Sequence, residues 1–234
     1  SAGAPEGRWR ALTCGLARIG LDQVNYAFLD FATYSRMDAR GDPAMTTMRQ
    51  DWIDYYVDQQ YDLDDDIVAH VRAGRSDPKF FRLSRPEHFG HRTMAEEARE
   101  AGLQAGLLTP LPGPWGDLLP AAGIVMGSGL GEEETARIIG DHAPELVALA
   151  HLLHTSMSGE LLRQRAGAPA LSPRERDCLQ LTANGLRVSQ IADRLTLADV
   201  TVHLHLRQAR RKLGARTLPE AVSKGMLYQQ ITPS

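Results

Sequence analysis

The sequence has few of the features that mark membrane, secreted or disulfide-bonded proteins. Its 234 residues contain only two cysteines, Cys14 and Cys178. No window reaches the roughly 18 consecutive apolar residues of a membrane-spanning helix, and the start, SAGAPEGRWR, lacks the apolar stretch of a signal peptide. We therefore expect a soluble, cytoplasmic protein without a membrane partner, in which both cysteines are buried, unreactive thiols.

The residue groupings of common catalytic and metal sites are also missing. The eight histidines form no cluster at metal-ligand spacing with cysteine or acidic residues. No nucleophile with a positioned base and no glycine-rich phosphate loop can be recognised. We therefore predict no metal, no cofactor and no enzymatic activity.

Charge is distributed unevenly along the chain. Residues 170–234 carry a net charge of +5, whereas residues 1–169 carry −8. A segment of small residues, Arg165-Ala-Gly-Ala-Pro-Ala170, lies between the two regions and is typical of a linker. We predict two domains, residues 1–164 and 171–234, joined by a linker at 165–170, and expect the basic domain to bind a polyanion.

The N-terminal region alternates helical patterns with short apolar runs. The expected helices cover 8–19, 48–61, 65–74, 87–101 and 132–165, the last with a bend near Pro144. The expected strands cover 26–34, 107–111 and 122–126. Pro120, close to the last of these, indicates a sheet edge or a bulge. This combination predicts an α+β sandwich.

The C-terminal region carries three helix-start signals in close succession. Ser172-Pro173-Arg174-Glu175 provides an N-cap serine, a proline at the first helical position and a capping-box glutamate. Ser189 and Asp199 are expected to cap the next two helices. Short capped helices in this order, the last of them basic, are typical of a helix-turn-helix domain.

The helix expected after Asp199 has an apolar face and a basic face. Four apolar residues recur at helical spacing and should pack on the domain core: Val202, Leu206, Ala209 and Leu213. The residues that we expect to contact DNA are Thr201, His203, Arg207, Arg210, Arg211 and Lys212. Arg207 and Arg210 would read bases in the major groove, and Arg211 and Lys212 would contact phosphates. The alternative is a solvated basic face on a helical hairpin.

The run from Leu171 to Ala215 resembles the DNA-binding domain of the LuxR family. A glutamate, a leucine and a glycine that are nearly universal in that family fall here on Glu175, Leu179 and Gly185. The resemblance implies an all-α domain of four helices, the fourth at 218–228. It also implies a homodimer that binds palindromic double-stranded DNA, with RNA polymerase as a further candidate partner.

In the N-terminal region, residues 52–56 (WIDYY) and 61–68 (YDLDDDIV) resemble the autoinducer-binding domain of LuxR-type quorum-sensing receptors. That domain binds acyl-homoserine lactones, and its fold is an α/β/α sandwich with a mainly antiparallel sheet. The resemblance implies that Trp52 donates its indole N–H to the lactone carbonyl and Tyr56 its hydroxyl to the amide carbonyl. Asp65 would accept from the amide N–H, as an ionised carboxylate can.

Three further positions follow from the same resemblance. Phe80 would lie near the lactone ring, in a position where the family usually has tryptophan. Gly106 would leave room for the ligand, and Met48 stands where many members carry a tyrosine that reaches it. The helix expected at 132–165 is the candidate dimer interface. Its apolar residues would form that interface or would simply pack in the core: Ile138, Ile139, Leu146, Leu149 and Leu152.

Two departures from the family pattern keep a second interpretation open. Asp66 replaces the usual proline, and Met48 replaces the tyrosine, so the regulator could respond to a non-lactone ligand or act without one. Trp52 and Tyr56 could also be a core pair on a helix, and the acidic run at 62–66 a solvated helix start.

Overall fold

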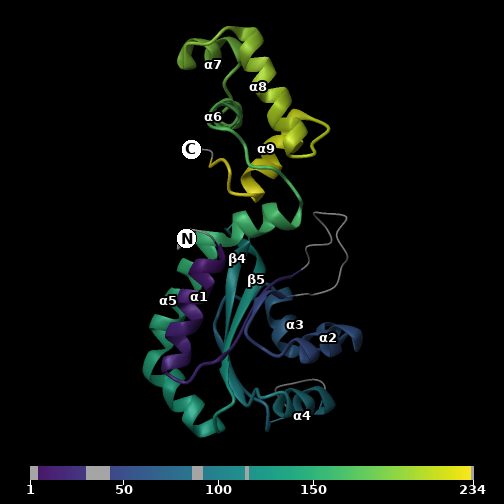
Figure 1. Ribbon diagram of the computed structural model, residues 1–234, viewed down its shortest axis with the longest axis vertical. Coiled ribbons are helices and arrows are strands. Elements are labelled where there is room, and N and C mark those ends of the chain that lie inside the picture. Colours follow the sequence, from purple (N-terminus) through teal and green to yellow (C-terminus); the bar gives the residue numbers. More distant parts are fainter. Residues whose placement is uncertain (1–4, 30–42, 86–91, 114–115, 233–234) are drawn as a thin grey trace. The chain divides into compact units, whose positions relative to one another are not determined.

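The computed structural model describes residues 5–29, 43–85, 92–113 and 116–232 (Figure 1). The chain divides into two compact units, Ser1–His154 and Thr155–Ser234. This division falls inside helix α5 (Glu132–Arg165), upstream of the linker expected at 165–170. One contact shows why: Gln229 Nε2 donates to Ser158 Oγ at 2.8 Å, so the last turns of α5 pack with the C-terminal residues.

The described residues of the N-terminal unit form a five-stranded, antiparallel sheet in the order β2-β1-β5-β4-β3. The strands are β1 (Gln23–Phe28), β2 (Pro43–Thr46), β3 (Lys79–Arg82), β4 (Ala105–Gly113) and β5 (Gly116–Ser128). Strands β2 and β3 were not predicted, because four residues are too few to show a clear alternation. Pro120 pairs with Pro112 where the register of β4 and β5 shifts, which confirms the irregularity expected there.

Helices cover both faces of this sheet, so the α/β/α sandwich is confirmed. The helices are α1 (Pro5–Arg18), α2 (Gln50–Asp58), α3 (Asp66–Arg72), α4 (Arg92–Glu100) and α5, with a 3₁₀ turn, η2, at Tyr61–Leu63. In Figure 1, α1 and α5 lie along one face and α2, α3 and α4 along the other. On the α5 side, the buried Tyr26 hydroxyl and His154 Nδ1 share a hydrogen bond of 2.8 Å. Pro144 lies inside α5, which is assigned as one helix across it.

The face under α2, α3 and α4 carries an apolar cluster that we call the α2–α4 cluster. Its buried members are Tyr61, Ile67, Val71, Phe81, Leu83, Met94, Ala95, Ala98, Leu103 and Leu108. Partly buried residues packed against it are Leu29, Met48, Trp52, Tyr56 and Val125. Burial of this much apolar surface fixes α2 and α3 over the sheet and brings the predicted ligand-binding residues of α2 into one region.

The C-terminal unit contains the four predicted helices, α6 (Pro173–Ala183), α7 (Val188–Leu195), α8 (Asp199–Lys212) and α9 (Leu218–Leu227). The capping box of Ser172 and Glu175 is confirmed. Ser189 and Asp199 are not caps, because the N-caps are Arg187 and Ala198. The Arg187 backbone N–H donates to the Gln190 side chain at 2.9 Å, so α7 begins before Ser189.

Both cysteines were predicted to be buried, and this prediction is wrong for one of them. Cys14 is exposed, whereas Cys178 is buried. On α1 the inward positions are taken by Trp9 and Leu16, which leaves Cys14 on the outer side. Within the described residues, no helix has the length and apolar character needed to cross a membrane.

Candidate functional site

The candidate ligand site is built on α2, whose Trp52 and Tyr56 lie one turn apart. Their ring centroids are 6.0 Å apart in an edge-to-face arrangement, and Tyr56 contacts Tyr61 in the same way at 5.9 Å. The side chains of Trp52 and Tyr56 pack against the α2–α4 cluster without being fully buried. The core-pair interpretation therefore describes their packing, but it does not account for the polar partner of Tyr56.

That partner is Asp65, a buried carboxylate that is only 8% exposed. Its Oδ2 accepts a hydrogen bond of 2.8 Å from the Tyr56 hydroxyl. Its Oδ1 accepts one of 2.7 Å from the Ile67 backbone N–H, which makes Asp65 the N-cap of α3. The solvated helix start proposed for the acidic run therefore fits the exposed Asp64 but not Asp65.

Burial controls the protonation of this pair. It raises the pKa of Asp65, and the nearby charge of Asp66 adds to the effect, while hydrogen bonds from Tyr56 and from the backbone of α3 act in the opposite direction. Burial, followed by the charge of Asp65, raises the pKa of Tyr56 well above its ordinary value. Tyr56 therefore remains a donor. A carboxylate has about four acceptor sites, so Asp65 retains capacity for another donor.

A second tyrosine–carboxylate group, which sequence reasoning missed, lies beside the first. Glu97 of α4 accepts from the Tyr61 hydroxyl at 2.6 Å and from the Tyr55 hydroxyl at 3.1 Å. The hydrogen bond to Glu97 is the largest of the effects that raise the pKa of Tyr61. No local pattern reveals this group, because Glu97 is remote in sequence from both tyrosines.

The expected position of Phe80 needs correction. Alternation along β3 places Phe81 and Leu83 in the α2–α4 cluster and Phe80 on the opposite face, with the Arg82 guanidinium carbon 5.6 Å from its ring centroid. The family resemblance placed Phe80 near the lactone ring, but a shift of one residue along a strand reverses the face that a side chain occupies. Phe81 lies opposite Gly106, where a Cβ would come within 2.8 Å of the Phe81 ring. The room left by Gly106 is therefore occupied by Phe81.

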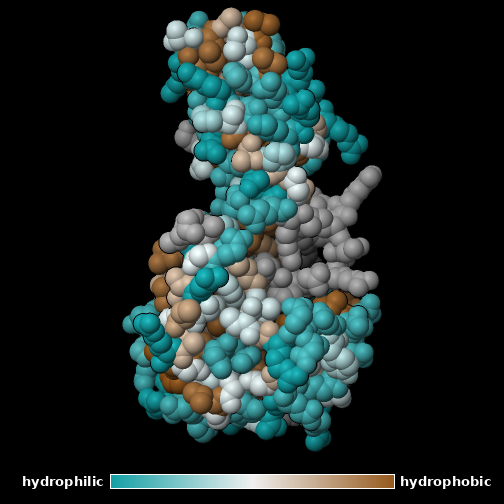
Figure 2. Space-filling model, in the orientation of Figure 1, coloured by the Kyte–Doolittle hydropathy of each residue, from teal (hydrophilic) through white to brown (hydrophobic). Residues whose placement is uncertain are grey.

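On α8, the predicted separation of faces is confirmed. Val202, Leu206, Ala209 and Leu213 are buried. The outer face carries the exposed residues His203, Arg207, Arg210 and Arg211, with Thr201 half-buried at its start. Val200 and Leu204 add exposed apolar side chains to this face. Figure 2 shows brown, apolar atoms among teal ones at the end of this unit where α7 and α8 meet. A helix with exposed donors and methyl groups has the chemistry needed to read base edges in a major groove.

Lys212 differs from the other basic residues of α8. Its Nζ lies 2.7 Å from Glu175 Oε2, and the Glu175 side chain is only 4% exposed. The same Oε2 accepts from the Ser172 backbone N–H at 2.7 Å. Burial by itself raises the pKa of Glu175, but the bonds from Lys212 and Ser172 outweigh it and hold the pKa below its ordinary value. Glu175 thus ties the start of α6 to the end of α8.

The other two signature residues have equally structural positions. Leu179 is fully buried on α6. Gly185 follows α6 with φ +84°, in the left-handed region that favours glycine. We assign the three signature residues to the architecture of the domain and not to DNA contacts.

Comparison with known proteins identifies both units. The chain matches the autoinducer binding domain over residues 5–157 and the LuxR family of bacterial regulatory proteins over residues 169–224. The chain belongs to the LuxR family. This LuxR-type protein is a quorum-sensing transcriptional regulator with an autoinducer-binding domain and a helix-turn-helix domain, and it is not an enzyme.

Individual proteins agree with this assignment. The regulator is 32% identical to the transcriptional activator RaiR of Rhizobium etli over 180 residues, which cover 75% of this chain and 72% of RaiR. It is 30% identical to VanR of Vibrio anguillarum over 150 residues, 61% of this chain and 58% of VanR. Escherichia coli SdiA has the same fold, with a TM-score of 0.58 at 18% identity over 98% of this chain and 92% of SdiA.

Proposed function

We propose that this LuxR-type regulator binds an acyl-homoserine lactone over α2 and α3 and binds palindromic DNA as a homodimer through α8. The observation that carries the ligand proposal is the buried Asp65 carboxylate, held by Tyr56 in the same cluster as Trp52. The site residues that we propose are Trp52, Tyr56, Asp65, Met48 and, in place of Phe80, Phe81. A solved relative of this fold, CepR2 of Burkholderia cenocepacia, is described as acyl-homoserine-lactone dependent; it is 17% identical, with a TM-score of 0.55 over 68% of this chain and 88% of CepR2.

The chemistry of the site suits an amide. Asp65 is an acceptor for an amide N–H, and the Trp52 indole can only donate, as a lactone carbonyl requires. The Tyr56 hydroxyl donates to Asp65 in this structure, so it must rotate towards the ligand to donate to an amide carbonyl. The amide N–H then replaces Tyr56 at Asp65, and the buried carboxylate keeps its hydrogen bond through the exchange.

Thermal unfolding with lactones of increasing acyl length tests the ligand proposal. A ligand at about 100 times its Kd stabilises the folded state by about 2.7 kcal/mol, which raises Tm by several degrees. We expect such a rise with one range of chain lengths. If the protein binds DNA and no lactone changes its Tm, the result favours a regulator that responds to a non-lactone ligand or acts without a ligand.

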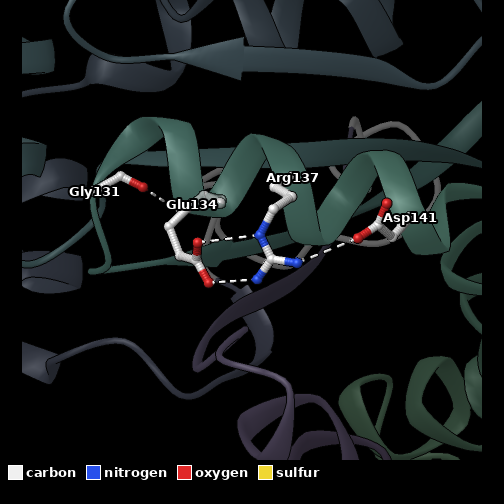
Figure 3. A network of polar contacts seen from close by, with 5 residues as sticks. Gly131, Glu134, Arg137 and Asp141 are labelled. Atoms are coloured by element: carbon white, nitrogen blue, oxygen red, sulfur yellow. Dashed lines mark hydrogen bonds and ion pairs between the residues drawn. The ribbon is translucent and has the colours of Figure 1, made fainter.

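The dimer proposal rests on one side of α5. Ile138, Ile139 and Leu146 are buried and belong to the core, whereas Leu149 is 42% and Leu152 67% exposed. An earlier part of α5 carries exposed ion pairs. Arg137 lies between Glu134 and Asp141 (Figure 3), with guanidinium-to-carboxylate distances of 2.7 Å to Glu134 and 3.4 Å to Asp141. Exposed charges of this kind contribute little to stability, whereas exposed leucines gain from burial against a second copy.

The DNA proposal is tested by replacing Arg207 with alanine. If Arg207 binds a base, the variant should lose about 1–3 kcal/mol of affinity for its operator and discriminate less between operator variants. Binding is measured by fluorescence anisotropy at fixed salt. Arg216→Ala, which removes an exposed charge just beyond α8, serves as the control. An equal loss on all sequences would assign Arg207 to the DNA backbone instead.

A further inference from the structure

Asn25 of β1 has a buried acceptor atom that the ligand proposal does not use. Its side-chain oxygen, Oδ1, is inaccessible to solvent and has no hydrogen-bond partner in the part of the chain that the structure describes. The register places Asn25 between Thr46 of β2 and Val125 of β5. Asn25 is therefore a partly buried residue on an inner strand of the sheet, with an unsatisfied acceptor oxygen.

The side chain of Asn25 lies on the ligand side of the sheet. Val24, Tyr26 and Phe28 are buried on the α5 side, so Gln23, Asn25 and Ala27 face the other way. Leu29 lies four residues after Asn25, so in an extended chain both point to the same face. Leu29 and Val125 both pack against the α2–α4 cluster. Asn25 thus shares a face with residues that contact the same cluster as Trp52 and Tyr56.

Neighbouring hydroxyl groups are already engaged. The Thr46 hydroxyl donates to the Val24 carbonyl at 3.4 Å and accepts from the Met48 backbone N–H at 3.0 Å. The Thr47 hydroxyl donates to the Asp22 carbonyl at 2.6 Å. A buried acceptor without a donor costs free energy, and a group that supplies the donor recovers it.

We propose that Asn25 selects lactones whose acyl chain carries a hydroxyl group. This inference rests on the proposed function and specifies its ligand class. A hydroxyl can donate to Asn25 Oδ1, whereas a ketone can only accept and a methylene group can do neither. A site with a buried polar group discriminates strongly against analogues that leave the group unpaired.

Three lactones with the same chain length test the proposal: the unsubstituted compound, its 3-hydroxy derivative and its 3-oxo derivative. Isothermal titration calorimetry gives Kd for the parent protein, for Asn25→Leu and for Gln23→Leu. Leucine has the same branched arrangement of side-chain heavy atoms as asparagine but no acceptor. Gln23 is the matched control, because its amide lies on the same face of β1 and is not among the unsatisfied groups. Asn25→Ala is the second variant if Asn25→Leu does not fold.

We expect the parent to bind the 3-hydroxy compound about ten-fold more tightly than the unsubstituted one. Asn25→Leu should lose this preference but still bind lactone, and Gln23→Leu should keep it. A parent that prefers the 3-oxo or unsubstituted compound, or a hydroxyl preference that survives in Asn25→Leu, overturns the role of Asn25 and leaves the lactone proposal intact. A parent that binds none of the three overturns both.

Discussion

Replacing Lys212 with methionine is expected to destabilise the C-terminal unit by about 3–5 kcal/mol, because it leaves the buried Glu175 carboxylate without its cation. Chemical denaturation of the full chain, followed by a signal from the C-terminal unit, measures the change. Arg211→Met is the matched control, since Arg211 is an exposed neighbour on the same helix. The double variant Glu175→Gln/Lys212→Met should recover part of the loss. Equal stability of Lys212→Met and Arg211→Met would show that the ion pair contributes nothing.

The same pair predicts how the C-terminal unit responds to acid. The pKa of Glu175 is lower in the folded state than its ordinary value of about 4.3. Its contribution to the free energy of unfolding is therefore complete above that value and is lost as the pH falls through the folded pKa. In Lys212→Met this loss should be smaller, because burial without the cation raises the pKa of Glu175.

Replacing Asp65 with asparagine is expected to weaken lactone binding by about 10- to 150-fold, the equivalent of a charge-assisted hydrogen bond of about 1.5–3 kcal/mol. The asparagine oxygen can still accept from the Ile67 N–H, so the cap of α3 survives. Asp64→Asn removes an exposed carboxylate from the same acidic run and serves as the control. Binding is measured by titration with the lactone that stabilises the parent most. Unchanged affinity in Asp65→Asn would reduce Asp65 to a helix cap.

Local patterns were sufficient to predict part of the C-terminal unit. The capping box at Ser172 and the buried apolar face of α8 depend on neighbours within a few residues, and both are confirmed. The position of α9, which the family resemblance implied, is confirmed as well. Helix starts without a conventional cap were predicted less well. The α7 helix begins after Arg187 because Gln190 bonds the backbone there, so the more conventional Ser189 was chosen incorrectly.

Non-local contacts explain what the sequence did not reveal. Lys212 appears as one more basic residue until the fold brings it to Glu175, and Glu97 appears as a surface acid until it meets Tyr55 and Tyr61. The exchange of Phe80 for Phe81 has a different origin. The family resemblance indicated the approximate position of this residue, but only the pairing of β3 with β4 determines its face.

In the proposed ligand site, the two oxygens of Asp65 have different roles. Oδ1 is bound to the backbone of α3, which fixes the rotation of the carboxylate before any ligand arrives. Oδ2 is held by a tyrosine hydroxyl, a partner that can turn away without disturbing a helix. A ligand amide therefore meets an acceptor whose orientation has already been set, and binding loses little side-chain entropy at that position. In the proposed binding mode, Asp65 exchanges the hydrogen bond from Tyr56 for one from the ligand amide while α3 keeps its first turn.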